Sequence, residues 1–158
     1  MTAGMPTHAG RTLLIFAIGL LLINVAMGDA DSPCSELANA TSFSFGATIY
    51  AGKIVSGQRA FSAVLHTRNP KSCFKKLMMS GNIQSKMYAL VGLRELDPAQ
   101  FRVELNRLRE QRFAVVVLAT EESGAIKSKS GEAVLKEIAA GLFHRDFLFA
   151  RDRLLQVD

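Results

Sequence analysis

Residues 83–96 read Ile-Gln-Ser-Lys-Met-Tyr-Ala-Leu-Val-Gly-Leu-Arg-Glu-Leu and are followed at once by Asp97-Pro98. Lys86 lies off the apolar face of this stretch, whose members recur at helical spacing and predict a buried helix face: Ile83, Met87, Leu90, Val91 and Leu96. Asp97 is a favoured helix cap and Pro98 a favoured first helical residue, so a second helix is expected to begin here. Because the connection is so short, the two helices should pack as an antiparallel pair.

The second helix of this pair has its own amphipathic pattern. Gln100 stands where the partner in a capping box would stand. Phe101, Leu105 and Leu108 form the apolar stripe. The charged residues are expected on the opposite side: Arg102, Glu104, Arg107, Arg109, Glu110 and Arg112.

Two further helices are predicted upstream. Asn69-Pro70 is a cap and first-turn pair, and the helix it opens places Cys73, Phe74, Leu77 and Met78 on one face before residues 80–82 end it. Ser32-Pro33 opens a shorter helix in the same way.

The segment between these helices, residues 42–66, is ambiguous. Its first part alternates apolar and polar residues like a strand: Phe43, Phe45, Ala47 and Ile49. Its second part fits a helical face: Ile54, Ala60, Phe61, Val64 and Leu65. Strand and helix therefore both stay open for this segment.

The C-terminal third begins with a strand pattern. Residues 113–119, Phe-Ala-Val-Val-Val-Leu-Ala, predict a strand that is buried on both faces or lies under the helices. Ser130 starts a helix that ends at Gly141, and residues 142–155 are apolar enough to close the core as a final helix. The fold class is mainly α, with α+β as the alternative: a compact helical domain with an antiparallel helix pair, at least one short strand and one disulfide.

The N-terminus resembles a secretory signal peptide in its order of residues. Arg11 precedes an uncharged apolar run over residues 12–27, which is shorter than the 20 or so residues needed to cross a bilayer. Small residues follow, so cleavage is expected after Gly28, with Ala30 as the second choice. The chain then divides into a signal peptide, residues 1–28, and one globular domain, residues 29–158, that is secreted or periplasmic. The alternative is an uncleaved membrane anchor.

Cys34 and Cys73 are the two cysteines of the chain. In an exported protein an isolated pair is expected to form a disulfide, because oxidising compartments preserve the bond. A thiol-redox centre is the alternative, but the two residues are far apart in the sequence and no Cys-x-x-Cys motif is present.

Positive charge is concentrated in the middle of the chain. Loss of residues 1–28 removes Arg11 and no acidic residue, which lowers the net charge from +5 to +4. Residues 59–112 hold 11 basic and 4 acidic residues. Such a region either is a solvated surface or faces an anionic envelope component or an acidic protein. Export makes nucleic acid an unexpected partner, and a membrane partner requires the uncleaved anchor. The candidate binding residues are Lys75, Lys76, Lys86, Tyr88, Arg102, Arg109, Arg112, Lys127 and Lys129.

Lys127 and Lys129 belong to the loop that looks most like a site. They stand beside serines just before a predicted helix N-terminus, where ammonium groups and backbone N–H groups could hold an anion. The Walker pattern is missing, and a flexible linker is the simpler interpretation.

No catalytic, metal-binding or cofactor motif is found. After signal cleavage only His66 and His144 remain as histidines, so a site with several histidine ligands is excluded. The sequence leaves open whether the protein is an enzyme. A non-enzymatic interaction or envelope-associated module is favoured, and the alternative is a secreted enzyme or enzyme inhibitor with a site near Lys86, Tyr88 and His144.

Residues 85–93, Ser-Lys-Met-Tyr-Ala-Leu-Val-Gly-Leu, resemble a stretch in a group of uncharacterised small exported bacterial domains, which carry Lys-x-Tyr-x-Leu-x-Gly-Leu. The resemblance covers roughly residues 73–141 and implies an extracytoplasmic location without any known activity. The stretch also has a physical interpretation, in which Tyr88 and Leu90 pack in the core and Gly92 allows a neighbouring helix to approach closely.

Overall fold

The computed structural model describes Met1 and residues 32–46, 54–118 and 126–153, which form a mainly helical fold with one small sheet. Within these residues no helix is both long and apolar enough to cross a membrane. The elements are α1 (Ser32–Ala38), α2 (Ser56–Leu65), α3 (Pro70–Ser80), α4 (Ile83–Leu96), α5 (Pro98–Arg109), β1 (Ala114–Leu118), β2 (Ile126–Ser130), α6 (Gly131–Ala140) and α7 (His144–Asp152).

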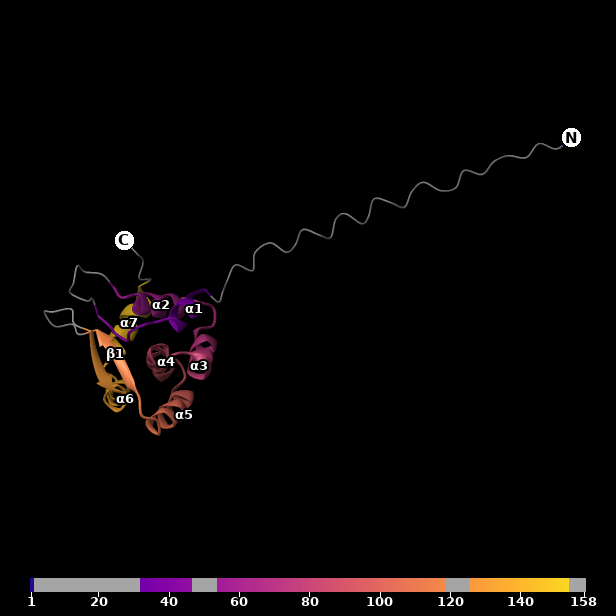
Figure 1. The fold of residues 1–158 in the computed structure, drawn as a ribbon. Coiled ribbons are helices and arrows are strands. Elements are labelled where there is room, and N and C mark those ends of the chain that lie inside the picture. The colour runs from indigo at the N-terminus through magenta and orange to yellow at the C-terminus, as the bar shows by residue number, and fades with distance from the viewer. Residues whose placement is uncertain (2–31, 47–53, 119–125, 154–158) are drawn as a thin grey trace.

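Helix α4 lies at the centre of the domain, with α3 and α5 on one side and β1 and α6 on the other (Figure 1). The sequence predicts one buried face for α4, and the structure corrects this. Met87, Tyr88, Ala89, Leu90 and Leu93 are all fully buried, although they point in different directions around the helix. Packing on every side therefore replaces the amphipathic pattern of a surface helix.

The expected helix starts are confirmed. The side chain of Asn69 accepts a hydrogen bond from the Ser72 N–H at the start of α3, and that of Asp97 accepts one from the Gln100 N–H at the start of α5. The predicted capping box is wrong, because the Gln100 side-chain amide does not reach back to Asp97. It donates instead to the Glu104 carboxylate, 2.9 Å away.

The close approach predicted at Gly92 is made by a side chain of the neighbouring helix. The Phe74 ring of α3 lies where a Cβ at this position would be, so only glycine leaves room for it. Aromatic packing thus joins α3 to α4.

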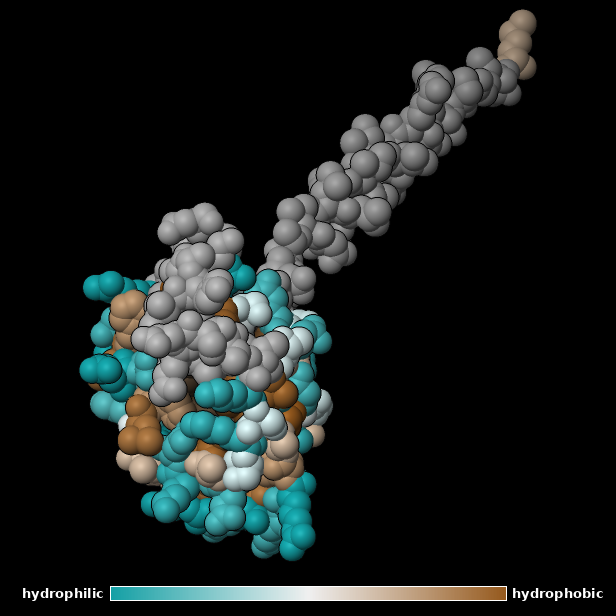
Figure 2. Space-filling model, turned by 60° about the vertical axis from the view of Figure 1, so that its left-hand side comes forward, coloured by the Kyte–Doolittle hydropathy of each residue, from teal (hydrophilic) through white to brown (hydrophobic). Residues whose placement is uncertain are grey.

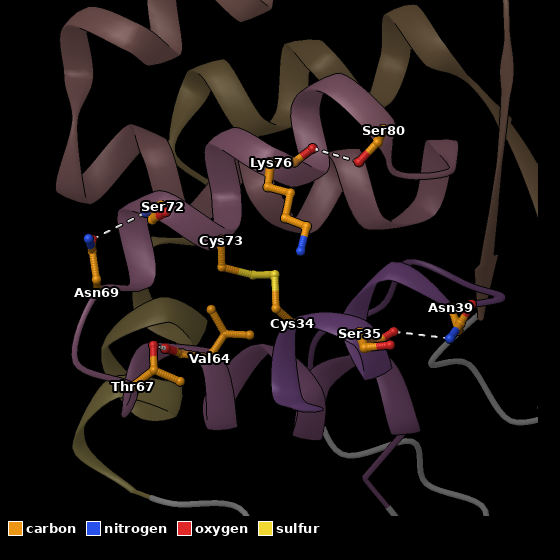
Figure 3. The surroundings of a disulfide bond; sticks show 10 residues. All are labelled: Cys34, Ser35, Asn39, Val64, Thr67, Asn69, Ser72, Cys73, Lys76 and Ser80. Carbon is orange, nitrogen blue, oxygen red and sulfur yellow. Dashed lines mark hydrogen bonds between the residues drawn. A yellow bond between two sulfur atoms is a disulfide. The ribbon is translucent and has the colours of Figure 1, made fainter. Parts of the chain in front are cut away.

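The disulfide between Cys34 and Cys73 is confirmed and joins α1 to α3, with a Cα–Cα distance of 5.8 Å (Figure 3). A second link holds the end of α1. The Asn82 amide donates to the carbonyl oxygens of Ala38 and Ala40, at 3.0 and 2.9 Å, while its oxygen caps α4 through the Ser85 N–H. One covalent bond and one side chain therefore attach α1 to the helices beside it.

The ambiguous segment contains both kinds of structure. Phe43 forms an isolated parallel bridge with Val117, and its N–H donates to the Val116 oxygen over 2.8 Å. Helix α2 then begins at Ser56. Ala47 and Ile49, which completed the predicted alternation, lie outside the described residues.

The strand predicted from residues 113–119 is confirmed as β1, which pairs with β2 in antiparallel register from Ala114 opposite Ser130 to Leu118 opposite Ile126. Val115 is fully buried, whereas Ala114 is exposed, so burial on both faces is wrong. The strand lies against α4 and α6 instead. The prediction of a flexible linker before α6 is also wrong from residue 126 onwards, because residues 126–130 form β2 and pair with β1.

The last two described elements are helices, as predicted. The Ser130 hydroxyl caps α6, and Gly141 ends it in the left-handed region at φ 81°. Phe147 and Ala150 of α7 are buried, and the Ser62 hydroxyl of α2 donates to the Ala150 oxygen, 2.9 Å away. The expected closure of the core by residues 142–155 is incomplete: Leu142 and Phe149 are exposed, whereas Leu154 and Leu155 lie outside the described residues.

We expect loss of the disulfide to destabilise the fold strongly. Replacing Cys34 and Cys73 together by alanine should lower the free energy of unfolding by about 3–4 kcal/mol, because the unfolded chain regains the freedom of the closed loop. Urea unfolding of both proteins without reductant measures this difference. A midpoint that stays unchanged would contradict a structural role for the bond.

Candidate functional site

The nine candidate residues do not form one surface. Lys75 and Lys76 belong to α3, Arg102 and Arg109 to α5, and Arg112 follows α5. Lys86 and Tyr88 lie on α4, whereas Lys127 and Lys129 lie on β2. Figure 1 places α3 and α5 on the opposite side of α4 from the sheet. The lysines of β2 belong to a different element from the arginines of α5, although the end of β2 meets the segment that follows α5, where the Gly131 N–H donates to the Phe113 oxygen.

The charge of Lys75 is used inside the fold. Its ammonium lies 2.9 Å from the Asp97 carboxylate, at the turn between α4 and α5. Together with the Gln100 N–H, this ammonium holds the pKa of Asp97 below its usual value. Lys75 thus links α3 to the start of α5.

Lys76 has a similar local environment. In Figure 3 its side chain runs from α3 past the disulfide towards α1. It is exposed, but it lies beside Cys34 rather than on the outer side of α5. The α3 lysines are therefore poor members of a shared binding surface with α5.

The placement of Tyr88 on a binding surface is wrong, because its side chain is fully buried. Its hydroxyl donates to the Ser44 carbonyl oxygen at 2.9 Å and accepts from the Ser44 N–H at 3.1 Å. Its ring packs against those of Phe43, Phe45 and Phe61, with centroids 5.0–5.8 Å apart. Burial raises the pKa of this phenol far above its usual value. The predicted packing role of Tyr88 is what the structure describes.

The anion site proposed before α6 is not assembled around both lysines. Lys129 lies 2.8 Å from the Glu137 carboxylate, and the Ser130 hydroxyl already caps the helix N-terminus through the Ala133 N–H. Lys127 is exposed. The charge of Lys129 is thus paired inside the domain, and the N–H groups of Gly131 and Ala133 at the start of α6 are bound by the Phe113 oxygen and the Ser130 hydroxyl.

Helix α5 carries one polar cluster that the sequence analysis missed. Glu104, expected on the charged side, is buried at 7 % exposure. Its carboxylate accepts from Gln100 and lies 2.6 Å from the Arg107 guanidinium, which also donates to the Met78 carbonyl oxygen of α3 at 2.8 Å. The spacing of these residues, four and three positions from Glu104, was the available signal. Arg107 is therefore committed to the fold.

The other α5 arginines remain free for a partner. Arg102 and Arg109 are exposed and form no ion pair with any residue that the structure describes. Asn106 and Arg109 follow Arg102 by four and seven residues, so the three side chains lie on the same side of the helix. Val103, beside them, is 61 % exposed. Arg112 follows the helix and is also exposed. The candidate functional site is this outer face of α5: Arg102, Val103, Asn106 and Arg109.

The residues of the enzyme alternative do not converge. The imidazole of His144 lies 2.9 Å from the Glu95 carboxylate, near the C-terminal end of α4. Lys86 is nine residues earlier on that helix, roughly 13 Å away along its axis. The Tyr88 hydroxyl faces the core. In the part of the chain that the structure describes, no three His, Cys, Asp or Glu residues are grouped to bind a metal ion.

Comparison of the chain with protein-family models, with curated proteins and with solved structures finds no match. The resemblance of residues 85–93 to small exported bacterial domains stays a prediction. The candidate site is accordingly defined by geometry and charge.

We expect Tyr88→Phe to lower the free energy of unfolding by about 1–3 kcal/mol, because the buried N–H and carbonyl of Ser44 lose their hydrogen-bond partner while the ring contacts remain. Chemical unfolding measures this loss. Thr41→Val removes an exposed hydroxyl and is the control, for which a change within about 0.5 kcal/mol is expected. Equal small effects of the two substitutions would contradict the role given to the phenol.

Proposed function

We propose that this protein is an exported, disulfide-stabilised, non-enzymatic binding module that recognises an anionic partner through the outer face of α5. The observation that carries the proposal is the contrast among its cations. Lys75, Arg107 and Lys129 bind carboxylates of the domain itself, whereas Arg102 and Arg109 are exposed without such a partner among the described residues.

Export is supported by the disulfide and by the composition of the N-terminus. Disulfides persist in oxidising compartments, and the Cys34–Cys73 bond secures α1, the first described helix. Residues 2–31, which contain most of the proposed signal peptide, lie outside the described part of the chain. A secreted or periplasmic location is proposed, and an uncleaved segment would instead anchor the same domain to a membrane.

Electrostatic recognition follows from the chemistry of the α5 face. Arginine presents a planar fork of donors that binds carboxylate or phosphate oxygens through two parallel hydrogen bonds. On the face of the domain in Figure 2, hydrophobic residues are scattered among hydrophilic ones and do not form one broad patch. The two exposed arginine forks make charged contacts the proposed basis for association, and an anionic envelope component or an acidic protein provides them.

Binding to anionic probes should depend on salt and on the α5 arginines. The protein is recovered from the extracytoplasmic fraction, where its N-terminal sequence is expected to begin at Asp29 or Asp31. Its binding to polyglutamate and to phosphatidylglycerol vesicles is measured at two salt concentrations. Raising NaCl from about 50 to 500 mM should weaken binding at least about 10-fold, because the ions screen exposed charges.

The variant pair locates the binding. Arg102→Ala with Arg109→Ala should weaken binding about 10-fold at low salt, since both forks are lost. Arg68→Ala with Lys136→Ala removes the same charge from exposed positions outside α5 and should leave most of the binding intact. Salt-independent binding, no binding to either probe, or equal losses in the two variants would contradict the proposed function.

A further inference from the structure

Resting on the proposed function, we infer that the outer face of α5 docks an acidic helical segment of a partner protein, with carboxylates seven residues apart. Arg102 and Arg109 are themselves seven residues apart on α5, with Asn106 between them. Two helical turns separate the arginines, about 10 Å along the axis. Acidic residues at the same spacing on a second helix lying along α5 would meet both guanidinium groups at once.

The donors of this face suit carboxylates on a regular scaffold. Each arginine fork has the geometry for a bidentate contact with one carboxylate. The Asn106 amide can both donate and accept, so it suits a polar side chain midway between the two carboxylates. On a partner helix, residues seven apart lie on one face and two turns apart, which matches the spacing of the two guanidinium groups, whereas lipid headgroups have no such fixed spacing. The spacing therefore favours a protein partner over a lipid surface.

Val103 adds an apolar contact to this row of donors. It is 61 % exposed and lies next to Arg102, one turn before Arg107. Protein interfaces combine such an apolar contact with surrounding arginines. The expected occupant is thus an acidic amphipathic helix with an apolar residue between its carboxylates.

The face is held rigid from below, which favours docking without rearrangement. Phe101, Leu105 and Leu108 bury the opposite side of α5 in the core. Arg107 fixes the helix to α3 through the Met78 carbonyl oxygen, 2.8 Å away. Because the backbone of α5 is already fixed, only the exposed side chains must be ordered on binding.

Two helical peptides of identical composition test the inference against the full protein. The first carries glutamates seven residues apart with a leucine between them on one face, and the second has these residues redistributed around the helix. The first peptide should bind at least about 10-fold more tightly, because only it engages both arginines together. Isothermal titration at low salt gives both affinities.

Substitutions then identify the contacts. Arg102→Lys keeps the charge and loses the fork of donors, so it should lower the affinity for the first peptide about 5-fold. Val103→Ser should weaken the same peptide and leave binding to phosphatidylglycerol vesicles unchanged. Arg68→Ala is the control outside α5 and should change neither affinity.

The failures of the two proposals can be told apart. Equal affinities for the two peptides, with salt-dependent binding that still needs Arg102 and Arg109, would overturn the helical partner and keep the proposed function. Vesicle binding without peptide binding would also overturn it, in favour of a lipid surface. Absence of any salt-dependent binding would overturn both proposals.

Discussion

The burial of helix α4 on every side is the constraint on which the rest of the structure depends. From Met87 to Leu93 the helix has no solvent-facing side, so it needs a neighbour in every direction. The Phe74 ring fills the space beside Gly92, and the first turn of α2 comes so near that a Cβ at Gly57 would lie 2.8 Å from the Tyr88 ring. The α4 sequence thus sets how closely α2 and α3 approach.

The Tyr88 hydroxyl extends this constraint to the sheet. Its two hydrogen bonds to Ser44 fix an extended segment next to α4. The preceding residue, Phe43, then bonds to Val116 and forms a bridge to β1. One buried phenol therefore connects the helical core to the edge of the sheet, and this explains why a residue first considered for binding belongs to the scaffold.

The same packing divides the charges of the domain between structure and function. Cations near the helix junctions are paired internally, as Lys75 is with Asp97 and Arg107 with Glu104. Arg102 and Arg109, which have no carboxylate partner in the described ranges, lie instead on the outside of α5. The proposed function therefore uses the periphery of a fold whose centre is committed to packing.

Local signals were enough to predict much of this fold. Asn69-Pro70 and Asp97-Pro98 mark helix starts whose capping depends on neighbouring residues. The disulfide was predicted from an isolated pair of cysteines together with the expectation of export. The strand β2 was missed because Lys127 and Lys129 gain their structure from pairing with β1, which no local pattern records. Periodicity also cannot reveal that a helix with one apolar face will be buried all round. The candidate site required the structure, because only the internal ion pairs distinguish Arg107 from Arg102 and Arg109.

Native-state hydrogen exchange of the α4 amides tests the central place of this helix most directly. If α4 holds the domain together, the amides of residues 87–93 should exchange only through global unfolding, with an opening free energy equal to that measured by denaturant. Exchange of these amides through a smaller opening, while those of α3 and α6 stay protected, would contradict the account.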